Sequence, residues 1–181
     1  MESSISHLPR YHHIQILIHW LSALLIIFII VLPLSRNFWA PLFGGISQVF
    51  MLHKSLSVIV FMMTIVRIVV NIKLGVPEVL PANAHLLRLA ANSTQKLLYL
   101  LLLMLPISGF LMGAKGINFF NIWLIPAMDL SSETMAIAHT SHIWGAYIMI
   151  ALILLHAVAA LFHHYIKKDN VLNSMRMRRE G

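Results

Sequence analysis

Residues 142–168 read HIWGAYIMIALILLHAVAALFHHYIKK, an apolar run that ends in two lysines and carries His142 and His156 fourteen positions apart. On an α-helix, fourteen residues make almost four turns, so the two side chains lie within about 40° of one face and about 21 Å apart along the axis. The hydrocarbon core of a bilayer is about 30 Å thick. The spacing therefore predicts two metal or haem sites stacked across a membrane on one helix.

The composition places the whole chain in a membrane. Of its 181 residues, 59% are hydrophobic and 10% are charged, whereas a soluble domain has about 25% charged residues. The net charge of +7 comes from Lys and Arg beside the apolar runs, a pattern that sets membrane topology and does not indicate a nucleic acid partner. The chain has no cysteine, which excludes disulfides, thiolate metal sites and covalent c-type haem. Histidine is therefore the expected metal ligand.

Four apolar runs are each long enough to cross the bilayer as a helix. We expect transmembrane segments at about residues 14–34, 49–70, 97–113 and 143–166, all in a single domain that comprises residues 1–181. Ser131, Ser132 and Glu133 form a helix start, so the last helix is expected to begin well before its apolar core. The predicted fold class is an all-α membrane protein, a four-transmembrane-helix bundle.

Lys and Arg are shared unequally between the two sides of this bundle. Cytoplasmic loops carry the excess of these residues, which predicts that both termini are cytoplasmic. The aromatic loop at residues 116–132 is expected to lie on the outer interface. One side holds Arg10, Lys73, Arg88, Lys167, Lys168, Arg176, Arg178 and Arg179, and the other holds Arg36 and Lys115.

The order of the spans gives each membrane histidine a depth. His19 and His156 both fall toward the cytoplasmic side, whereas His53 and His142 both fall toward the outer side. Ionisable residues inside a membrane mark functional sites, and two facing imidazoles can bind haem iron from both sides within a helical bundle. We therefore predict the axial pairs His19/His156 and His53/His142. Iron with two axial histidines has no open position for oxygen, so the predicted chemistry is electron transfer.

Two cations lie near these predicted haem sites. Arg67 follows His53 by fourteen residues and therefore shares its helix face, close to the cytoplasmic surface. We expect its guanidinium to bind a propionate of the cytoplasmic haem; the alternative is an arginine that reaches the lipid headgroups. Lys54, next to His53, is expected to bind a propionate of the outer haem.

The last helix carries two further histidines outside the predicted axial pairs. His163 lies seven residues after His156 on nearly the same face, which makes it a candidate for a propionate contact or for proton exchange; the alternative is a plain interfacial residue. His139 is turned about 100° from the face of His156. We expect His139 to face a loop or to form a hydrogen bond, and not to bind haem.

Each of the four spans contains or adjoins at least one short, distinctive motif. They are His19-Trp20, His53, Val66-Arg67, Leu105-Pro106 with Gly109, His142, Leu155-His156-Ala157, Ala159-Ala160-Leu161, His163-His164-Tyr165 and Lys168-Asp169-Asn170. Together they resemble the bacterial cytochrome b561 family over nearly the whole chain. The resemblance implies a multi-pass protein of the bacterial inner membrane with two non-covalent haem b groups and the four histidines as axial ligands. At least one bacterial member is a superoxide oxidase that passes electrons to ubiquinone, but the loop at residues 115–132 shows little of the family pattern.

Three functions are compatible with these features. The leading one is a membrane oxidoreductase that moves electrons between an outer donor, with superoxide as a candidate, and ubiquinone. Positive charge near the outer haem would steer superoxide electrostatically. It would come from Arg36, Lys54 and Lys115 and be opposed by the negative charge of Asp129 and Glu133. The second is a haem-bearing membrane-anchor subunit that serves a redox partner protein, a separate dehydrogenase or hydrogenase. The third, a proton or ion transporter, requires acidic partners in the membrane, and the four apolar cores contain no Asp or Glu.

Overall fold

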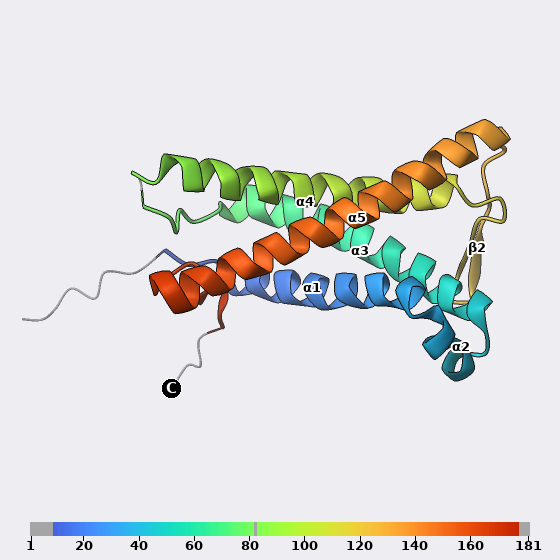
Figure 1. Ribbon diagram of the computed structural model, residues 1–181, viewed down its shortest axis with the longest axis horizontal. Helices are drawn as coiled ribbons and strands as arrows, with labels where there is room; N and C mark the ends of the chain where they lie inside the picture. Colours follow the sequence, from blue (N-terminus) through green and yellow to red (C-terminus); the bar gives the residue numbers. More distant parts are fainter. Residues whose placement is uncertain (1–8, 82, 178–181) are drawn as a thin grey trace, which may run out of the picture.

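The computed structural model describes residues 9–81 and 83–177, and four long helices of this part form one bundle (Figure 1). Each of the four is long and apolar enough to cross a membrane, which confirms the predicted four-helix class. Arg178 and Arg179, which contribute to the predicted orientation, lie outside the described residues. The long helices are α1 (His13–Leu34), α3 (Ile46–Leu74), α4 (His85–Leu111) and α5 (Ser132–Phe162).

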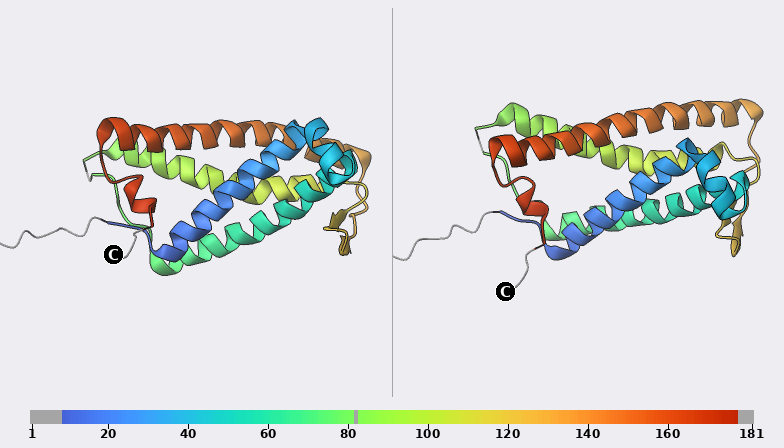
Figure 2. Two further views of the ribbon diagram at one scale, coloured as in Figure 1. Left: turned by 90° about the horizontal axis from the view of Figure 1, so that it is seen from below. Right: turned by 60° about the horizontal axis from the view of Figure 1, so that its bottom comes forward.

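The start of α1 and the end of α5 lie at the same end of the bundle, which we call the terminal end (Figure 2). The opposite end, the hairpin end, carries the short helix α2 (Arg36–Phe43) and the antiparallel strands β1 (Ile117–Phe119) and β2 (Trp123–Ile125). The sequence predicted an interfacial loop at the hairpin and no strands. Phe120 and Asn121 adopt positive φ between the two strands and so close the turn.

Local signals explain where the helices start. His12 and Gln15 form a reciprocal capping box at the start of α1. Ser131 accepts a hydrogen bond from the Thr134 backbone N–H, which confirms the predicted early start of α5. Helix α4 begins at His85, well before the apolar run expected from residue 97, because residues 85–96 contain many good helix formers and no Gly or Pro.

The helices pack as two pairs, α1 against α3 and α4 against α5, with α3 also contacting α4. Val60, Leu102 and Met149 form the buried core between them. The outer surface remains apolar, as shown by Ile72, which is 77% exposed; an apolar outer surface is what lipid requires. Helix α5 runs diagonally across the bundle (Figure 1), so its histidines reach α1 at the terminal end and α3 at the hairpin end.

Candidate functional site

The structure brings the four membrane histidines together as two facing pairs. The ring centres of His19 on α1 and His156 on α5 are 6.2 Å apart, and those of His53 on α3 and His142 on α5 are 6.3 Å apart. Two metal–nitrogen bonds of about 2 Å and two ring radii separate the centres of imidazoles on opposite sides of one metal ion by about 6 Å. Both pairs therefore have the spacing that a shared metal ion requires.

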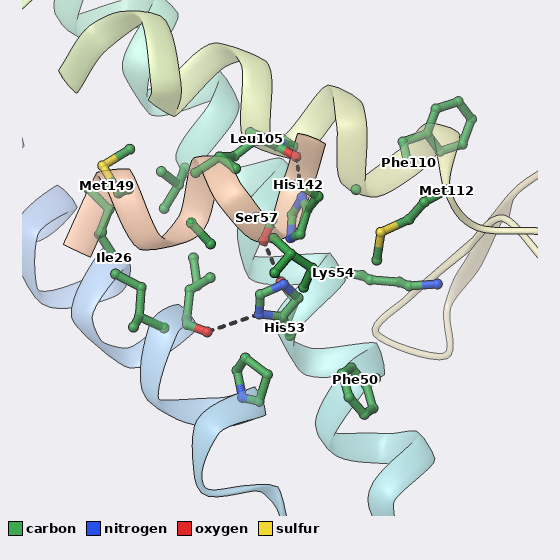
Figure 3. Close-up of a pocket in the computed structure, with 18 of the residues that line it drawn as sticks. Ile26, Phe50, His53, Lys54, Ser57, Leu105, Phe110, Met112, His142 and Met149 are labelled. Carbon is green, nitrogen blue, oxygen red and sulfur yellow. Dashed lines mark hydrogen bonds between the residues drawn. The ribbon is translucent and has the colours of Figure 1, made fainter. Parts of the chain in front are cut away.

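Both rings of the hairpin-end pair are held through Nδ1 by backbone carbonyls (Figure 3). His53 Nδ1 lies 2.9 Å from the Ile29 oxygen, and His142 Nδ1 lies 3.0 Å from the Leu105 oxygen, with Ser108 Oγ at 3.2 Å. A carbonyl can only accept, so each Nδ1 carries the ring proton and Nε2 keeps its lone pair. This is the arrangement by which neighbouring groups orient metal-binding histidines.

Pro33 explains why the Ile29 carbonyl is free to accept this bond. Within an α-helix that carbonyl would accept from the backbone N–H four residues later, at position 33, and proline has no N–H. A proline inside the first span thus leaves the Ile29 carbonyl free to accept the hydrogen bond from His53. We did not predict this contact from the sequence, although the spacing of Pro33 from Ile29 is the signal for it.

The hairpin-end pair lines a cavity of about 410 Å³ with mostly apolar walls from all four long helices. Gly109 lies opposite His142, where a Cβ atom would come within 3.1 Å of the His142 ring atom Cε1. The volume lies within the range of small-molecule and cofactor sites, about 300–1,000 Å³. A mostly apolar cavity lined by both imidazoles fits a flat, largely apolar plate with a metal at its centre.

Polar side chains also line this cavity, among them those of Arg36, Lys54 and His139. We expected His139 to face a loop or to form a hydrogen bond; the structure places this exposed side chain in the cavity lining. His139 precedes His142 by three residues, close to one helical turn, so the two side chains share a face of α5. Comparison of His139 with the more distant His156 alone does not reveal this shared face. Lys54 extends away from the ring of His53 (Figure 3), and its Nζ lies 3.4 Å from the Gly116 oxygen.

At the terminal end, Arg67 contacts the histidine pair directly. Its Nη2 lies 2.8 Å from Nδ1 of His19. A guanidinium can only donate, so His19 Nδ1 accepts in this arrangement. His19 is half-buried and His156 is exposed, which makes this pair more open than the one at the hairpin end.

Comparison with known proteins adds a family to this geometry. Residues 10–177 match the prokaryotic cytochrome b561 family. The chain belongs to this family. It is 32% identical to cytochrome b561 homolog 2 of Escherichia coli K12, covering 92% of this chain and 90% of that protein. It is 29% identical to the probable superoxide oxidase CybB of Yersinia pestis, covering 95% and 98%, and 31% identical to cytochrome b562 of Cereibacter sphaeroides, covering 92% and 95%.

Membership in the cytochrome b561 family, together with the four apolar helices, makes the chain a multi-pass protein of the bacterial inner membrane. It also implies haem b as the cofactor. The residues present fit that group, because each histidine pair has the spacing for one iron and the hairpin-end pair opens into an apolar cavity.

Polar side chains beside Arg67 form a second group of residues that we did not predict from the sequence. Gln15, Asn71 and Tyr99 link to one another by hydrogen bonds. The signal for two of them is a four-residue spacing in otherwise apolar runs, Gln15 before His19 and Asn71 after Arg67. Burial raises the pKa of the nearby Tyr11 hydroxyl, with Arg67 opposing this rise and Tyr99 adding to it.

His163 follows α5 in the π-helical turn η1 (His163–Lys167) and is 8% exposed. Its Nδ1 pairs with the Asp169 carboxylate. Lys168 adopts a left-handed conformation between them, with φ at 54°, and turns the chain back so that Asp169 can reach the ring. The pairing leaves Nε2 of His163 for another partner, so both sequence-based alternatives, a propionate contact and proton exchange, remain predictions.

Proposed function

We propose that this member of the cytochrome b561 family is a di-haem protein that transfers electrons from a donor at the hairpin end to ubiquinone at the terminal end. Both termini are cytoplasmic in this proposal, and superoxide is the candidate donor. The observation that carries the proposal is the presence of two imidazole pairs on one helix, His53/His142 and His19/His156, each with ring centres at iron-sharing distance.

Haem bound between each pair would supply reversible one-electron chemistry at its iron. The Ile29 and Leu105 carbonyls keep His53 and His142 oriented and their Nε2 atoms deprotonated. With a histidine on each side of the iron, such a haem would favour electron transfer over oxygen binding. The mostly apolar cavity walls disfavour water at the hairpin-end site.

Arg67 is proposed to change its partner at the terminal-end site when His19 binds iron. A metal at Nε2 of His19 requires the ring proton to reside on Nδ1, and Nδ1 then no longer accepts from the guanidinium. Arg67 would then be free to bind a haem propionate, whose two oxygens match the guanidinium fork. Lys54 is proposed for the corresponding contact at the hairpin end, where it lines the cavity.

Superoxide as donor is supported by the charge at the cavity and by the name of one relative, the probable superoxide oxidase CybB. Arg36 and Lys54 line the hairpin-end cavity, and positive charge there attracts an anion along its approach. The rate with superoxide should therefore fall as ionic strength rises. A rate that is indifferent to salt would contradict electrostatic steering.

Reduction of ubiquinone to ubiquinol consumes two electrons and two protons, which two superoxide anions and the solvent supply as two molecules of O2 form. His163 is the proposed proton donor, because its pairing with Asp169 fixes the ring and leaves Nε2 available. Asp169→Asn should slow ubiquinol formation while both haems remain bound. Unchanged turnover in that variant would exclude the role of this pair.

The experiment that tests the proposal is haem quantitation in the purified protein and in His19→Ala, His53→Ala, His142→Ala and His156→Ala. We expect two haems per chain, with each pair of variants losing the same one. His139→Ala, at a position that lines the cavity beside His142, is the control and should keep both. Unchanged haem content in any of the four ligand variants would overturn the assignment.

The membrane-anchor alternative is tested with the isolated protein. Superoxide-dependent ubiquinol formation by the purified chain alone supports an independent oxidoreductase. If electrons pass only when a separate dehydrogenase or hydrogenase is added, the chain is instead a subunit that relays electrons for that partner.

A further inference from the structure

Arg67 carries a positive charge within a membrane span, and no carboxylate pairs with it among the residues that the structure describes. Its neighbours are instead His19, at 2.8 Å, and Tyr99, whose ring centre lies 5.2 Å from the guanidinium carbon. This distance is typical of a cation–π contact. Tyr99 on α4 therefore contacts the guanidinium of Arg67, a residue of α3. That guanidinium points at His19 on α1.

A chain of hydrogen bonds in turn fixes Tyr99. Asn71 donates to the Tyr99 hydroxyl over 2.9 Å, and Gln15 donates to Asn71 Oδ1 over 3.0 Å. Gln15 is only 3% exposed; it also donates to the Gly75 oxygen and accepts from the His12 backbone N–H. A buried amide with all these bonds satisfied is strongly constrained. These hydrogen bonds thus connect α1, α3 and α4 and lead to Tyr99, which contacts the Arg67 guanidinium.

The hairpin-end pair is supported differently. Its Nδ1 atoms bond to backbone carbonyls, and in the described residues no cation contacts either ring. Lys54 is directed to the Gly116 oxygen, and Arg36 to the Pro33 oxygen. The two sites therefore differ in how their cations are placed: a guanidinium contacts a ring of the terminal-end pair, whereas Arg36 and Lys54 line the hairpin-end cavity without touching either ring.

A positive charge beside a haem favours the reduced iron, which carries one positive charge fewer than the oxidised iron. Ligation of His19 through Nε2 would turn Arg67 from Nδ1 to a propionate of the same haem, so its charge would still lie beside that haem. We propose that Tyr99, Asn71 and Gln15 are positioning residues that hold Arg67 at the terminal-end haem and thereby raise its reduction potential. This inference rests on the proposed function.

The test is a redox titration of the purified holoprotein and its variants, with His53→Ala, which keeps the terminal-end haem, to assign the two midpoint potentials. Tyr99→Leu removes the ring beneath Arg67, so the terminal-end potential should fall while the hairpin-end potential stays constant. Arg67→Gln should lower the same potential further, by roughly a tenfold change in the reduction equilibrium. Arg67→Lys keeps the charge and should recover most of this loss.

The decisive comparison is the double variant Tyr99→Leu with Arg67→Gln. If Tyr99 acts through Arg67, the double variant has the same potential as Arg67→Gln alone. A merely structural role would instead add the two effects, and that result overturns the inference. Lys73→Gln is the matched control, because it removes the same charge from the end of the same helix; it should leave both potentials nearly unchanged.

The remaining outcomes separate this inference from the proposed function. Fewer than two haems in the parent protein would contradict the proposed function itself. Two haems together with unchanged potentials in Tyr99→Leu and Arg67→Gln would overturn only the positioning role. Should Tyr99→Leu fail to assemble, Tyr99→Phe, which loses only the bond from Asn71, takes its place in the same cycle, and an unchanged terminal-end potential there overturns the inference.

Discussion

The imidazole of His142 lies directly against Gly109 of the neighbouring helix, where a Cβ atom would come within 3.1 Å of Cε1 and 3.3 Å of Nδ1. Gly109→Ala should therefore push the ring out of line with His53 and weaken haem binding at the hairpin end. Inserting a methyl group into a packed site typically costs about 1–3 kcal/mol. Haem content per chain and the unfolding temperature measure the effect.

Gly113→Ala is the control for this substitution. Gly113 lies four residues further along, and the nearest atom to an added Cβ there is the Phe110 oxygen at 3.4 Å. We expect this variant to keep both haems. Equal haem loss in Gly109→Ala and Gly113→Ala would show that the contact with His142 does not matter.

The ring planes of each pair are closer to perpendicular than to parallel, 70° for His19 and His156 and 80° for His53 and His142. In low-spin ferric haem, perpendicular axial imidazoles leave two iron d orbitals nearly equal in energy, which gives a strongly anisotropic EPR signal with one large g value. We expect two such signals in the oxidised protein. Ordinary rhombic signals from both haems would show that the rings adopt parallel planes.

The parts of the site that could be predicted from the sequence depend on single-helix geometry. Fourteen residues between His142 and His156 fix their common face on any helix, and the order of the spans brings His19 and His53 to matching depths. The four-helix class follows in the same way, from run length and hydropathy. None of these inferences requires knowing how one helix contacts another.

The parts that could not be predicted depend on contacts between helices or on backbone conformation. The Leu105 carbonyl reaches His142 only because α4 and α5 pack closely at Gly109. The strands of the hairpin are specified by pairing and by positive φ at Phe120 and Asn121, which no period in the sequence indicates. Propensity and hydropathy alone do not contain this information.

Pro33 offers a test of the carbonyl that supports His53. Pro33→Ala restores a backbone N–H that competes for the Ile29 oxygen, so the bond from His53 Nδ1 should weaken. A less strongly bonded Nδ1–H makes imidazole a poorer electron donor to iron. We therefore expect the hairpin-end haem to titrate at a higher reduction potential, although the helix itself gains propensity.

Pro41→Ala serves as the comparison for this variant, since Pro41 lies inside the short helix α2 and away from the carbonyl that supports His53. It should leave both potentials unchanged. A shift of the terminal-end potential in Pro33→Ala, in place of the hairpin-end potential, would contradict the role assigned to the Ile29 carbonyl.

The segment after η1 folds back onto the start of the chain and bonds to the residue next to His19. Trp20 donates from Nε1 to the Met175 oxygen over 2.8 Å, and the Tyr11 backbone N–H donates to the Ser174 oxygen over 3.3 Å. Deletion of residues 169–181 should lower stability, because each lost hydrogen bond contributes about 0.5–1.5 kcal/mol. The haem at His19 should be lost more readily than the one at the hairpin end, which haem release during heating measures.

A chain that ends at Met177 keeps these bonds and should behave as the full protein does. Parallel release of both haems from the chain that lacks residues 169–181 would show that the segment stabilises the bundle as a whole and not the His19 site.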